Sequence, residues 1–390
     1  MRSRRRPAPP AAGSPGLIVA ESRPPFRADH VGSLLRPASL KALRLEKEAG
    51  RATAAQLAAA EDTSIREAVK LQEEVGLEGI TDGEMRRKSW HMDFLMQLSG
   101  LTSEGKALPV TFHGREGDRF FTRPDLRLAA RVTRPRPIFV EPFSFLKSAA
   151  TRTPKLTMPS PSMFYTQVGG PNIDRTVYPD LDRFVEDLSA AYRAEIADLY
   201  AAGCRYLQLD DVSLAYLCDE DMRARGREAG EDPDAQLALS VKLIRATLRD
   251  RPKDLTVCTH LCRGNFRSSW RAQGGYAKVA ETIFTRLPYD GFFLEFDDAR
   301  SGDFSPLRHV PKHVRVVLGL LTSKVGALEK KDDLKRRLDE ATRYIALDQL
   351  CVSPQCGFSS TMEGNDVTVA EQRAKLALCV DLAREVWGGL

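Results

Sequence analysis

A histidine and a cysteine one residue apart, His260 and Cys262, are a pair that could do chemistry. They follow the apolar run 255–258, which predicts a short buried β-strand. Alternate residues of a strand point to the same face, so both side chains are expected to project together beyond the strand's end. One imidazole and one thiol supply half of a tetrahedral zinc site. An isolated pair of this kind more often only packs in a core, so the prediction depends on ligands from elsewhere.

Other reactive residues follow predicted strands in the same way. Carboxylates stand at or shortly after the ends of three predicted strands, Glu84, Asp210 and Glu295, and Cys356 follows a further strand within Pro-Gln-Cys-Gly. A buried, unpaired carboxylate is costly, and a metal ion would compensate that cost. The set suited to Zn²⁺ is His260, Cys262, Glu295 and Cys356. Because two of these ligands are thiolates, such a site favours a bound thiolate as the nucleophile over activation of water.

The elements that must position these residues alternate along the chain. Short β-like runs, each followed by helical periodicity, are predicted at 26–33, 78–81, 155–158, 206–209, 255–258, 292–294, 314–321 and 350–353. Strands alternating with helices pair in parallel through right-handed crossovers. Eight of them predict a single (β/α)₈ TIM barrel, with a β-rich insertion around residues 100–150. In such a barrel the active site lies at the carboxyl ends of the strands.

Predicted helices cover residues 38–50, 53–75, 181–202, 235–248, 276–287, 333–346 and 369–386. No glycine-rich dinucleotide or P-loop motif follows a strand, so a nucleotide site has no support. Residues 1–25 are rich in Pro, Ala and Arg, which predicts a disordered basic tail before a barrel domain at 26–390.

Composition restricts the function classes. The chain is 42% hydrophobic and 28% charged, as expected of a soluble globular protein. Its 58 Lys and Arg exceed its 53 Asp and Glu by only 5, and no basic stretch is interleaved with aromatics, so nucleic-acid binding is not expected. No run is long enough to span a membrane. Seven scattered cysteines favour reduced thiols in the cytoplasm.

Five motifs resemble a known family. Asp-His-Val-Gly-Ser, Thr-Asp-Gly-Glu, Leu-Gln-Leu-Asp-Asp, His-Leu-Cys-Arg-Gly-Asn and Ser-Pro-Gln-Cys-Gly-Phe, in this order, resemble the C-terminal catalytic half of cobalamin-independent methionine synthase, and most closely its short single-barrel relatives. The resemblance covers residues 26–390. It implies zinc-dependent alkyl transfer to a thiol, with zinc held by His260, Cys262, Glu295 and Cys356. It also implies that homocysteine is held at its amino-acid end by Gly32, Ser33, Glu84 and Asp210.

Two departures from the family concern the methyl donor. Tyr216 stands near the place of an acidic residue that contacts the pterin in the family, and no histidine follows the seventh predicted strand. Thr322, Ser323 and Lys324 are the nearby candidates for a proton donor, and Thr322 is predicted to be catalytic. The donor stays open between methyltetrahydrofolate, a corrinoid protein and another carrier. Arg86 and Arg87 either bind an anionic donor tail or are solvated.

The preferred hypothesis is a zinc-dependent methyltransferase that acts on the thiol of homocysteine or a similar small thiol. Glu84 and Asp210 would pair with the substrate ammonium. An alternative is zinc-dependent alkyl transfer to another thiol, as in epoxide:coenzyme M transferases, although a sulfonate-bearing thiol would favour Arg or Lys where these two acids stand. A second alternative is a non-catalytic binding protein in which four protein ligands close a structural zinc site.

Overall fold

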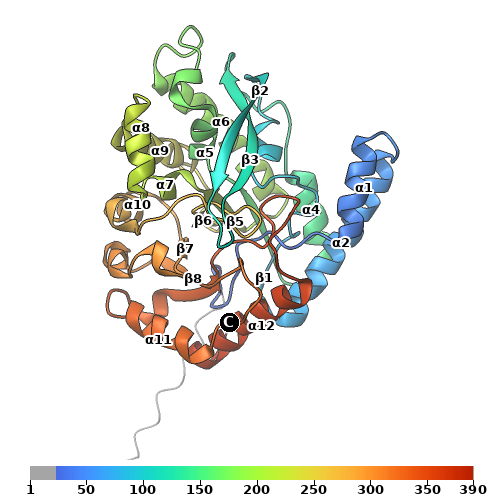
Figure 1. Ribbon diagram of the computed structural model, residues 1–390, viewed down its shortest axis with the longest axis vertical. Coiled ribbons are helices and arrows are strands. Elements are labelled where there is room, and N and C mark those ends of the chain that lie inside the picture. The colour runs from blue at the N-terminus through green and yellow to red at the C-terminus, as the bar shows by residue number, and fades with distance from the viewer. Residues whose placement is uncertain (1–22, 390) are drawn as a thin grey trace, which may run out of the picture.

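A curled sheet of parallel strands forms the centre of the molecule in this computed structural model, which describes residues 23–389 (Figure 1). Seven strands are hydrogen-bonded in the order β1-β4-β5-β6-β7-β8-β9. Their bounds are Gly79–Ile80 (β1), Thr153–Pro159 (β4), Tyr206–Asp211 (β5), Thr256–Leu261 (β6), Gly291–Glu295 (β7), Arg315–Leu321 (β8) and Leu350–Pro354 (β9). The architecture is TIM-barrel-like, which confirms the predicted fold class. Residues 1–22, most of the predicted tail, lie outside the described residues.

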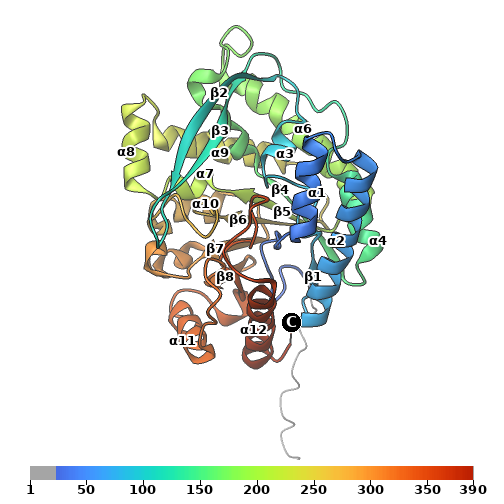
Figure 2. The ribbon, with the colours of Figure 1, turned by 45° about the vertical axis from the view of Figure 1, so that its right-hand side comes forward.

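Helices cover the outside of this sheet (Figures 1 and 2). The longer ones are α1 (Ala38–Glu48), α2 (Ala54–Val75), α4 (Val140–Ala149), α6 (Leu181–Ala201), α9 (Pro233–Thr247), α11 (Lys331–Ala341) and α12 (Val369–Trp387). Shorter helices are α3 (Met92–Leu95), α5 (Pro161–Val168), α7 (Ser213–Tyr216), α8 (Glu220–Glu228) and α10 (Ala280–Arg286). Between residues 23 and 389 no helix has both the length and the apolar character that crossing a bilayer requires.

Local signals explain why the predicted helices formed close to their expected bounds. α2 begins with a capping box in which Thr53 and Gln56 satisfy each other's backbone N–H groups, and it ends at Gly76 in the left-handed conformation with φ of 99°. Along α6, one face carries buried apolar residues such as Phe184, Leu188 and Leu199. This periodic face packs the helix onto the sheet and keeps the strand ends free for chemistry.

The first predicted strand, residues 26–33, is wrong as a strand. It makes one isolated parallel bridge, Ala28 with Val352 of β9, rather than a ladder. The carboxylate of Asp29 accepts the backbone N–H of Phe26 at 3.2 Å and that of His30 at 2.8 Å. A side chain that takes backbone donors in this way competes with sheet pairing. The segment therefore lies in an extended conformation beside β9 without forming a strand of the sheet.

An antiparallel hairpin makes up most of the predicted insertion. β2 (Leu101–Phe112) pairs with β3 (Arg119–Leu128), so the expectation of β-structure is confirmed for this part. It is wrong for residues 140–149, which form α4. Phe143 and Leu146 lie on the buried face of that helix, with Glu141 in its first turn and Lys147 in its last. Helical spacing and charges that match the helix dipole thus outweigh the β propensity of Phe139 and Val140.

Polar residues occupy the inside of the curled sheet and lead toward the strand ends. Lys155 of β4 forms an ion pair with Asp29 at 3.0 Å, and both side chains are fully buried. Tyr206 donates to the same carboxylate at 2.7 Å. Two residues further along β5, Gln208 donates through Nε2 to Asp210 at 2.6 Å. Because alternate residues of β5 point to the same face, its polar side chains form one row along the inside of the sheet, which reaches the carboxyl end of the strand where the reactive residues lie.

Candidate active site

Strand register brings the two predicted thiol ligands to one place. His260 of β6 lies level with Asp210 of β5 and Phe293 of β7. Cys262 follows β6 and Cys356 follows β9, and their Sγ atoms are 3.3 Å apart. The ligand atoms of His260, Cys262 and Cys356 all lie within 4.8 Å of one another, and all three residues are buried. The structure therefore groups three of the four predicted metal ligands.

Glu295, the fourth predicted ligand, ends β7 beside this group. Its side chain is fully buried, and its Oε1 is 3.8 Å from the Cys262 Sγ. The backbone N–H of Arg263 donates to its Oε2 at 3.0 Å, and the Gln355 amide donates to Oε1 at 3.3 Å. These contacts orient the carboxylate toward the two sulfur atoms. The predicted set is thus assembled in space, and its role as a ligand set stays a prediction.

The unsatisfied atoms of this group fit a metal ion. Both ring nitrogens of His260 are buried and, among the described residues, have no hydrogen-bond partner. A buried imidazole without partners is costly, and coordination would remove that cost. The hydrogen bond with Cys262, together with His260, lowers the pKa of Cys356 well below its ordinary value. The same shared proton raises the pKa of Cys262. One thiolate is therefore already favoured in a donor set of imidazole, two sulfurs and a carboxylate, which suits Zn²⁺.

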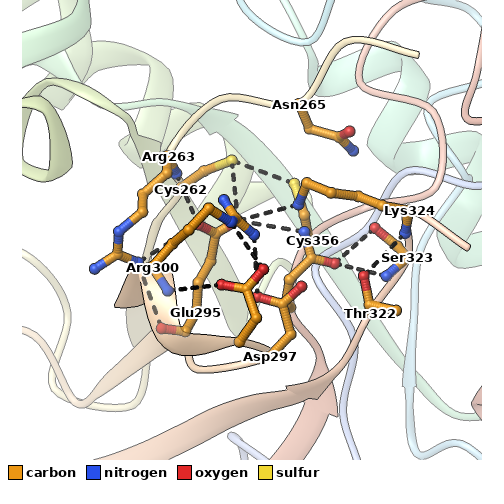
Figure 3. A network of polar contacts seen from close by, with 12 residues as sticks. Cys262, Arg263, Asn265, Glu295, Asp297, Arg300, Thr322, Ser323, Lys324 and Cys356 are labelled. Carbon is orange, nitrogen blue, oxygen red and sulfur yellow. Dashed lines mark hydrogen bonds and ion pairs between the residues drawn. The ribbon is translucent and has the colours of Figure 1, made fainter. Parts of the chain in front are cut away.

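A lysine ammonium lies against the same group. Lys324 follows β8, is 5% exposed, and extends its Nζ toward Glu295, ending 3.9 Å from Oε1 (Figure 3). Within residues 23–389 this Nζ has no hydrogen-bond partner. Its positive charge favours the ionised forms of Cys262 and Cys356. Lys324 therefore offsets part of the negative charge that two thiolates and a carboxylate bring together.

The predicted catalytic Thr322 does not line the cavity at this site. Its hydroxyl accepts the backbone N–H of Lys324 at 3.2 Å, which turns it into the loop after β8 (Figure 3). Ser323 is likewise engaged, because its hydroxyl donates to the Gln355 amide oxygen at 2.8 Å. The geometry gives no support to either hydroxyl as a proton donor, and the role of Thr322 stays a prediction.

Two carboxylates line the same cavity as the sulfur atoms. Glu84 and Asp210 are 2% and 6% exposed. Burial raises the pKa of Asp210 to about 7, and the charge of Glu84 adds to that shift. Burial also raises the pKa of Glu84, although Arg87 and Arg36 oppose it. Thr157 donates to Glu84 Oε1 at 2.9 Å, while Oε2 has no partner among the described residues. A cationic group is the ligand that such a pair would stabilise.

Close backbone packing shapes the turn that holds Gly32 and Ser33. Gly32 has φ of 141°, and a Cβ there would lie 2.6 Å from the Thr157 Cγ2. Opposite, a Cβ on Gly357 would lie 2.0 Å from the Ser33 Oγ. Only glycine fits at both positions. The turn consequently brings Ser33 into the cavity wall, beside Glu84 and Asp210.

Arg86 and Arg87 are held by the protein itself. Arg86 pairs with Asp62 at 2.5 Å and with Glu61 at 3.4 Å, outside the cavity lining. Arg87 pairs with Glu84 at 3.3 Å and donates to the Thr157 carbonyl at 2.6 Å. Burial of Arg87 excludes the solvated interpretation for that residue, whereas Arg86 is partly exposed. Neither residue lines the cavity described above, and a role in donor binding stays a prediction. Arg87 supports the cavity carboxylate Glu84, while Arg86 joins the segment after β1 to Glu61 and Asp62 of α2.

The cavity itself has a second wall that the sequence did not reveal. Residues of the hairpin and of nearby loops line it: Trp90, His91, Phe112, Phe121, Arg123, Phe266 and Arg271. The aromatic content of the insertion was visible in the sequence. Which of its residues fold back over the strand ends depends on hairpin register and docking, for which the sequence carries no local signal.

A family model described as "Cobalamin-independent synthase, Catalytic domain" matches residues 26–385. The chain belongs to this family. Members of the family are methyltransferases of the methionine synthase type, and the resemblance predicted from the five motifs is confirmed. The match spans the sheet, the hairpin and all the ligand and wall residues described above.

Three relatives place the chain within the family. The uncharacterized protein YxjH of Bacillus subtilis is 46% identical over 373 residues, which cover 94% of this chain and 96% of that protein. A 5-methyltetrahydropteroyltriglutamate–homocysteine methyltransferase of Thermosynechococcus vestitus is 25% identical over 340 residues, 86% of this chain but 40% of that protein. The crystal structure of a candidate vitamin-B12-independent methionine synthase from Listeria monocytogenes is 36% identical, with a TM-score of 0.75, covering 93% of this chain and 98% of that one.

Proposed function

We propose that this protein is a zinc-dependent methyltransferase that transfers a methyl group to the thiol of homocysteine or a closely similar amino thiol. The observation that carries this proposal is one cavity lined by two complementary groups. The first is the cluster of His260, Cys262 and Cys356, with Glu295 beside it. The second is the pair of buried carboxylates Glu84 and Asp210, of which Asp210 lies level with His260 on the adjacent strand. A small molecule with a thiol and an ammonium is complementary to both.

The protein residues would prepare the acceptor for attack. A zinc ion held by His260, Cys262, Glu295 and Cys356 would lower the pKa of a coordinated thiol and keep it ionised near neutral pH. Glu84 and Asp210 bind the ammonium and thereby fix the direction in which the sulfur points. Lys324 balances the negative charge of the ligand set from behind. Burial of the whole group excludes water, which would otherwise solvate the thiolate and weaken it as a nucleophile.

The transfer conserves atoms and electrons in a simple way. The thiol proton passes to solvent when the acceptor ionises. The sulfur then forms a bond to the methyl carbon, while the bond from that carbon to the donor atom breaks and its electron pair leaves with the donor. No step requires an oxidant or a reductant. The result is a thioether, which for homocysteine is methionine.

The alternative of a sulfonate-bearing thiol fits less well. Such an acceptor needs a cation where this cavity presents Glu84 and Asp210, whose like charges would repel a sulfonate. A purely structural zinc site also fits less well, because it would not need a cavity lined by its own ligands together with Glu84 and Asp210.

A transfer assay tests the proposal. The zinc-loaded protein would be incubated with homocysteine or with 2-mercaptoethanesulfonate, together with a panel of methyl donors: mono- and polyglutamyl methyltetrahydrofolate, methylcobalamin and a methylated corrinoid protein. We expect methionine to form with at least one donor and the sulfonate to stay unmethylated. Purified protein without stoichiometric zinc, or preference for the sulfonate, would contradict the proposal.

A further inference from the structure

One buried arginine, Arg36, joins two of the loops that line the cavity. It is 5% exposed and does not itself line the cavity. Its Nε donates to the Arg87 carbonyl at 3.1 Å and its Nη2 to the Glu84 carbonyl at 2.8 Å, both in the loop after β1. Its Nη1 donates to the carbonyl and the hydroxyl of Ser359, at 2.7 and 2.6 Å, and to the Thr361 carbonyl at 3.2 Å, all in the loop after β9. The two edges of one guanidinium therefore hold two different loops.

This link depends on the shape and the charge of an arginine. A guanidinium presents five N–H donors in one rigid plane, whereas a lysine ammonium presents three from a single atom. Burial lowers the pKa of Arg36 to about 10, and the charge of Glu84 opposes that shift, so the side chain stays cationic near neutral pH. Its charge in turn favours the ionised form of Glu84. Arg36 thus acts on Glu84 through the backbone and through its charge.

Glu84 has a backbone conformation that residues other than glycine rarely adopt. Its φ is 59°, in the left-handed region. The carboxylate of Asp82 accepts the Glu84 N–H at 2.8 Å, while Arg36 and the Arg87 N–H donate to the Glu84 carbonyl at 2.8 and 3.0 Å. A strained conformation persists only where its surroundings fix it. Arg36 therefore helps to set the direction in which the Glu84 side chain leaves the backbone.

The turn that carries Ser33 lies between the same two loops. The Leu34 N–H donates to the Gly83 carbonyl of the first loop at 3.1 Å, and the Phe358 N–H of the second loop donates to the Ser33 carbonyl at 2.9 Å. Arg36 belongs to the segment that continues from this turn. Three segments that contribute residues to the cavity lining therefore meet at one side chain.

We propose that Arg36 is a positioning residue that sets the distance between the ammonium site at Glu84 and the sulfur site at Cys356, and thereby the length of the acceptor thiol. This inference rests on the proposed function, because it concerns how the same acceptor is selected. Homocysteine and cysteine carry the same ammonium and thiol, separated by chains that differ by one methylene. Two sites at a fixed distance distinguish these molecules, whereas two sites joined by a loose loop adapt to either one.

Equilibrium binding of three thiols to the full-length zinc-loaded protein tests this inference. Calorimetry would compare homocysteine, cysteine and 1-propanethiol, which binds through sulfur alone. We expect the wild-type protein to bind homocysteine about tenfold or more tightly than cysteine. In Arg36→Met this ratio should fall to about threefold or less, because homocysteine loses the advantage of a fixed spacing. The affinity for 1-propanethiol and the zinc content should stay as in the wild-type protein, which a general loss of structure would not allow.

Two milder variants keep the test decisive if Arg36→Met does not fold. Ser359→Ala removes the hydroxyl that accepts from Arg36 at 2.6 Å and leaves the backbone acceptors of Arg36 in place. It should lower the ratio of homocysteine to cysteine affinity about two- to fivefold. Arg36→Lys keeps the charge, but one ammonium cannot hold both loops, so its ratio should be closer to that of Arg36→Met than to that of the wild-type protein.

Arg44→Lys is the matched control. Arg44 is 3% exposed and donates to the Met85 carbonyl at 2.8 Å in the same loop after β1, but its ion-pair partner is Glu61 of α2. We expect this variant to lower the melting temperature and to keep the preference for homocysteine. A wild-type preference in both Arg36→Met and Ser359→Ala, or an equal loss of preference in Arg44→Lys, overturns the inference. A wild-type protein that binds no thiol at all would contradict the proposed function, on which the inference rests.

Discussion

The two walls of the cavity are built on different principles. The thiol wall, formed by Glu84, Asp210, His260, Cys262, Glu295 and Cys356, lies at the ends of parallel strands, and its reactive groups are buried. Glu295 is held by hydrogen bonds from Arg263 and Gln355, whereas both ring nitrogens of His260 have no hydrogen-bond partner among the described residues. The hairpin wall comes from an insertion, and its arginines are half-buried without counter-charges. The register of the sheet fixes which residues meet the acceptor thiol. The residues of an inserted hairpin, in contrast, can change without disturbing that register. We infer that donor choice is the more variable property of this fold.

The largest expected effect is the loss of a ligand from the thiol wall. Cys356→Ser replaces a thiolate with a poor zinc ligand, so we expect zinc affinity to fall about 100-fold or more and methyl transfer to be lost. Metal content after dialysis against a chelator measures this. Cys351→Ser, which changes a cysteine within β9 that belongs to the interior cluster with Phe26 and Tyr206, should keep its zinc. Full zinc retention in Cys356→Ser would contradict the assignment of Cys356 as a zinc ligand.

The next largest effect concerns the two carboxylates of the thiol wall, Glu84 and Asp210. Asp210→Asn removes one charge from the predicted ammonium site, and we expect homocysteine affinity to fall about 30-fold, as for other buried charge pairs. The affinity for 3-mercaptopropionate, a thiol without an ammonium, should change little. Titration calorimetry with both thiols provides the comparison. An equal loss for both thiols would mean that Asp210 supports the fold instead of recognising the ammonium.

A pH effect of about tenfold follows from the same residue. The pKa of Asp210 is raised to about 7, so below that pH the free protein holds a proton that an incoming ammonium must displace. Affinity for methionine, which has an ammonium but no thiol proton, should therefore rise about tenfold between pH 6 and 8. The slope should vanish in Asp210→Asn. A flat profile in the wild-type protein would contradict the assignment.

The smallest expected effect lies in the hairpin wall. Phe121→Ala removes one ring from the apolar surface, and we expect the KM for the methyl donor to rise about two- to tenfold. Zinc content and homocysteine affinity should stay as in the wild-type protein. Phe120→Ala, which changes a neighbouring ring that is 72% exposed, is the matched control. A change in zinc content in Phe121→Ala would show that the two walls are coupled after all.

The residues of the thiol wall were largely predictable from the sequence, because strand periodicity and a position at the end of a strand indicate where their side chains lie. His260 and Cys262 follow an apolar run, and Glu295 ends another, so parallel strands bring them to one edge. The segment at residues 26–33 was mistaken for a strand because it is short, partly apolar and ends in Gly-Ser, while the hydrogen bonds that the Asp29 carboxylate accepts from the Phe26 and His30 backbone leave no pattern in the sequence.

The hairpin wall was not predictable in the same way. Arg123 and Arg271 are 148 positions apart in sequence, and they meet only because β2 and β3 fold back onto the loop after β6. Nothing local distinguishes them from solvated arginines. The position of Arg86 and Arg87 after Glu84 suggested a ligand site, and the sequence did not show that nearby acids and a carbonyl hold both. Thr322 was chosen by position after β8, whereas its hydroxyl accepts the Lys324 N–H.

X-ray absorption at the zinc edge, with and without homocysteine, tests the central claim most directly. The claim is that His260, Cys262, Glu295 and Cys356 hold a zinc ion to which the acceptor thiol binds. We predict two sulfur ligands in the free protein and three when homocysteine is present. An unchanged sulfur count on saturation with homocysteine would contradict thiol activation at this site and leave the zinc with a structural role.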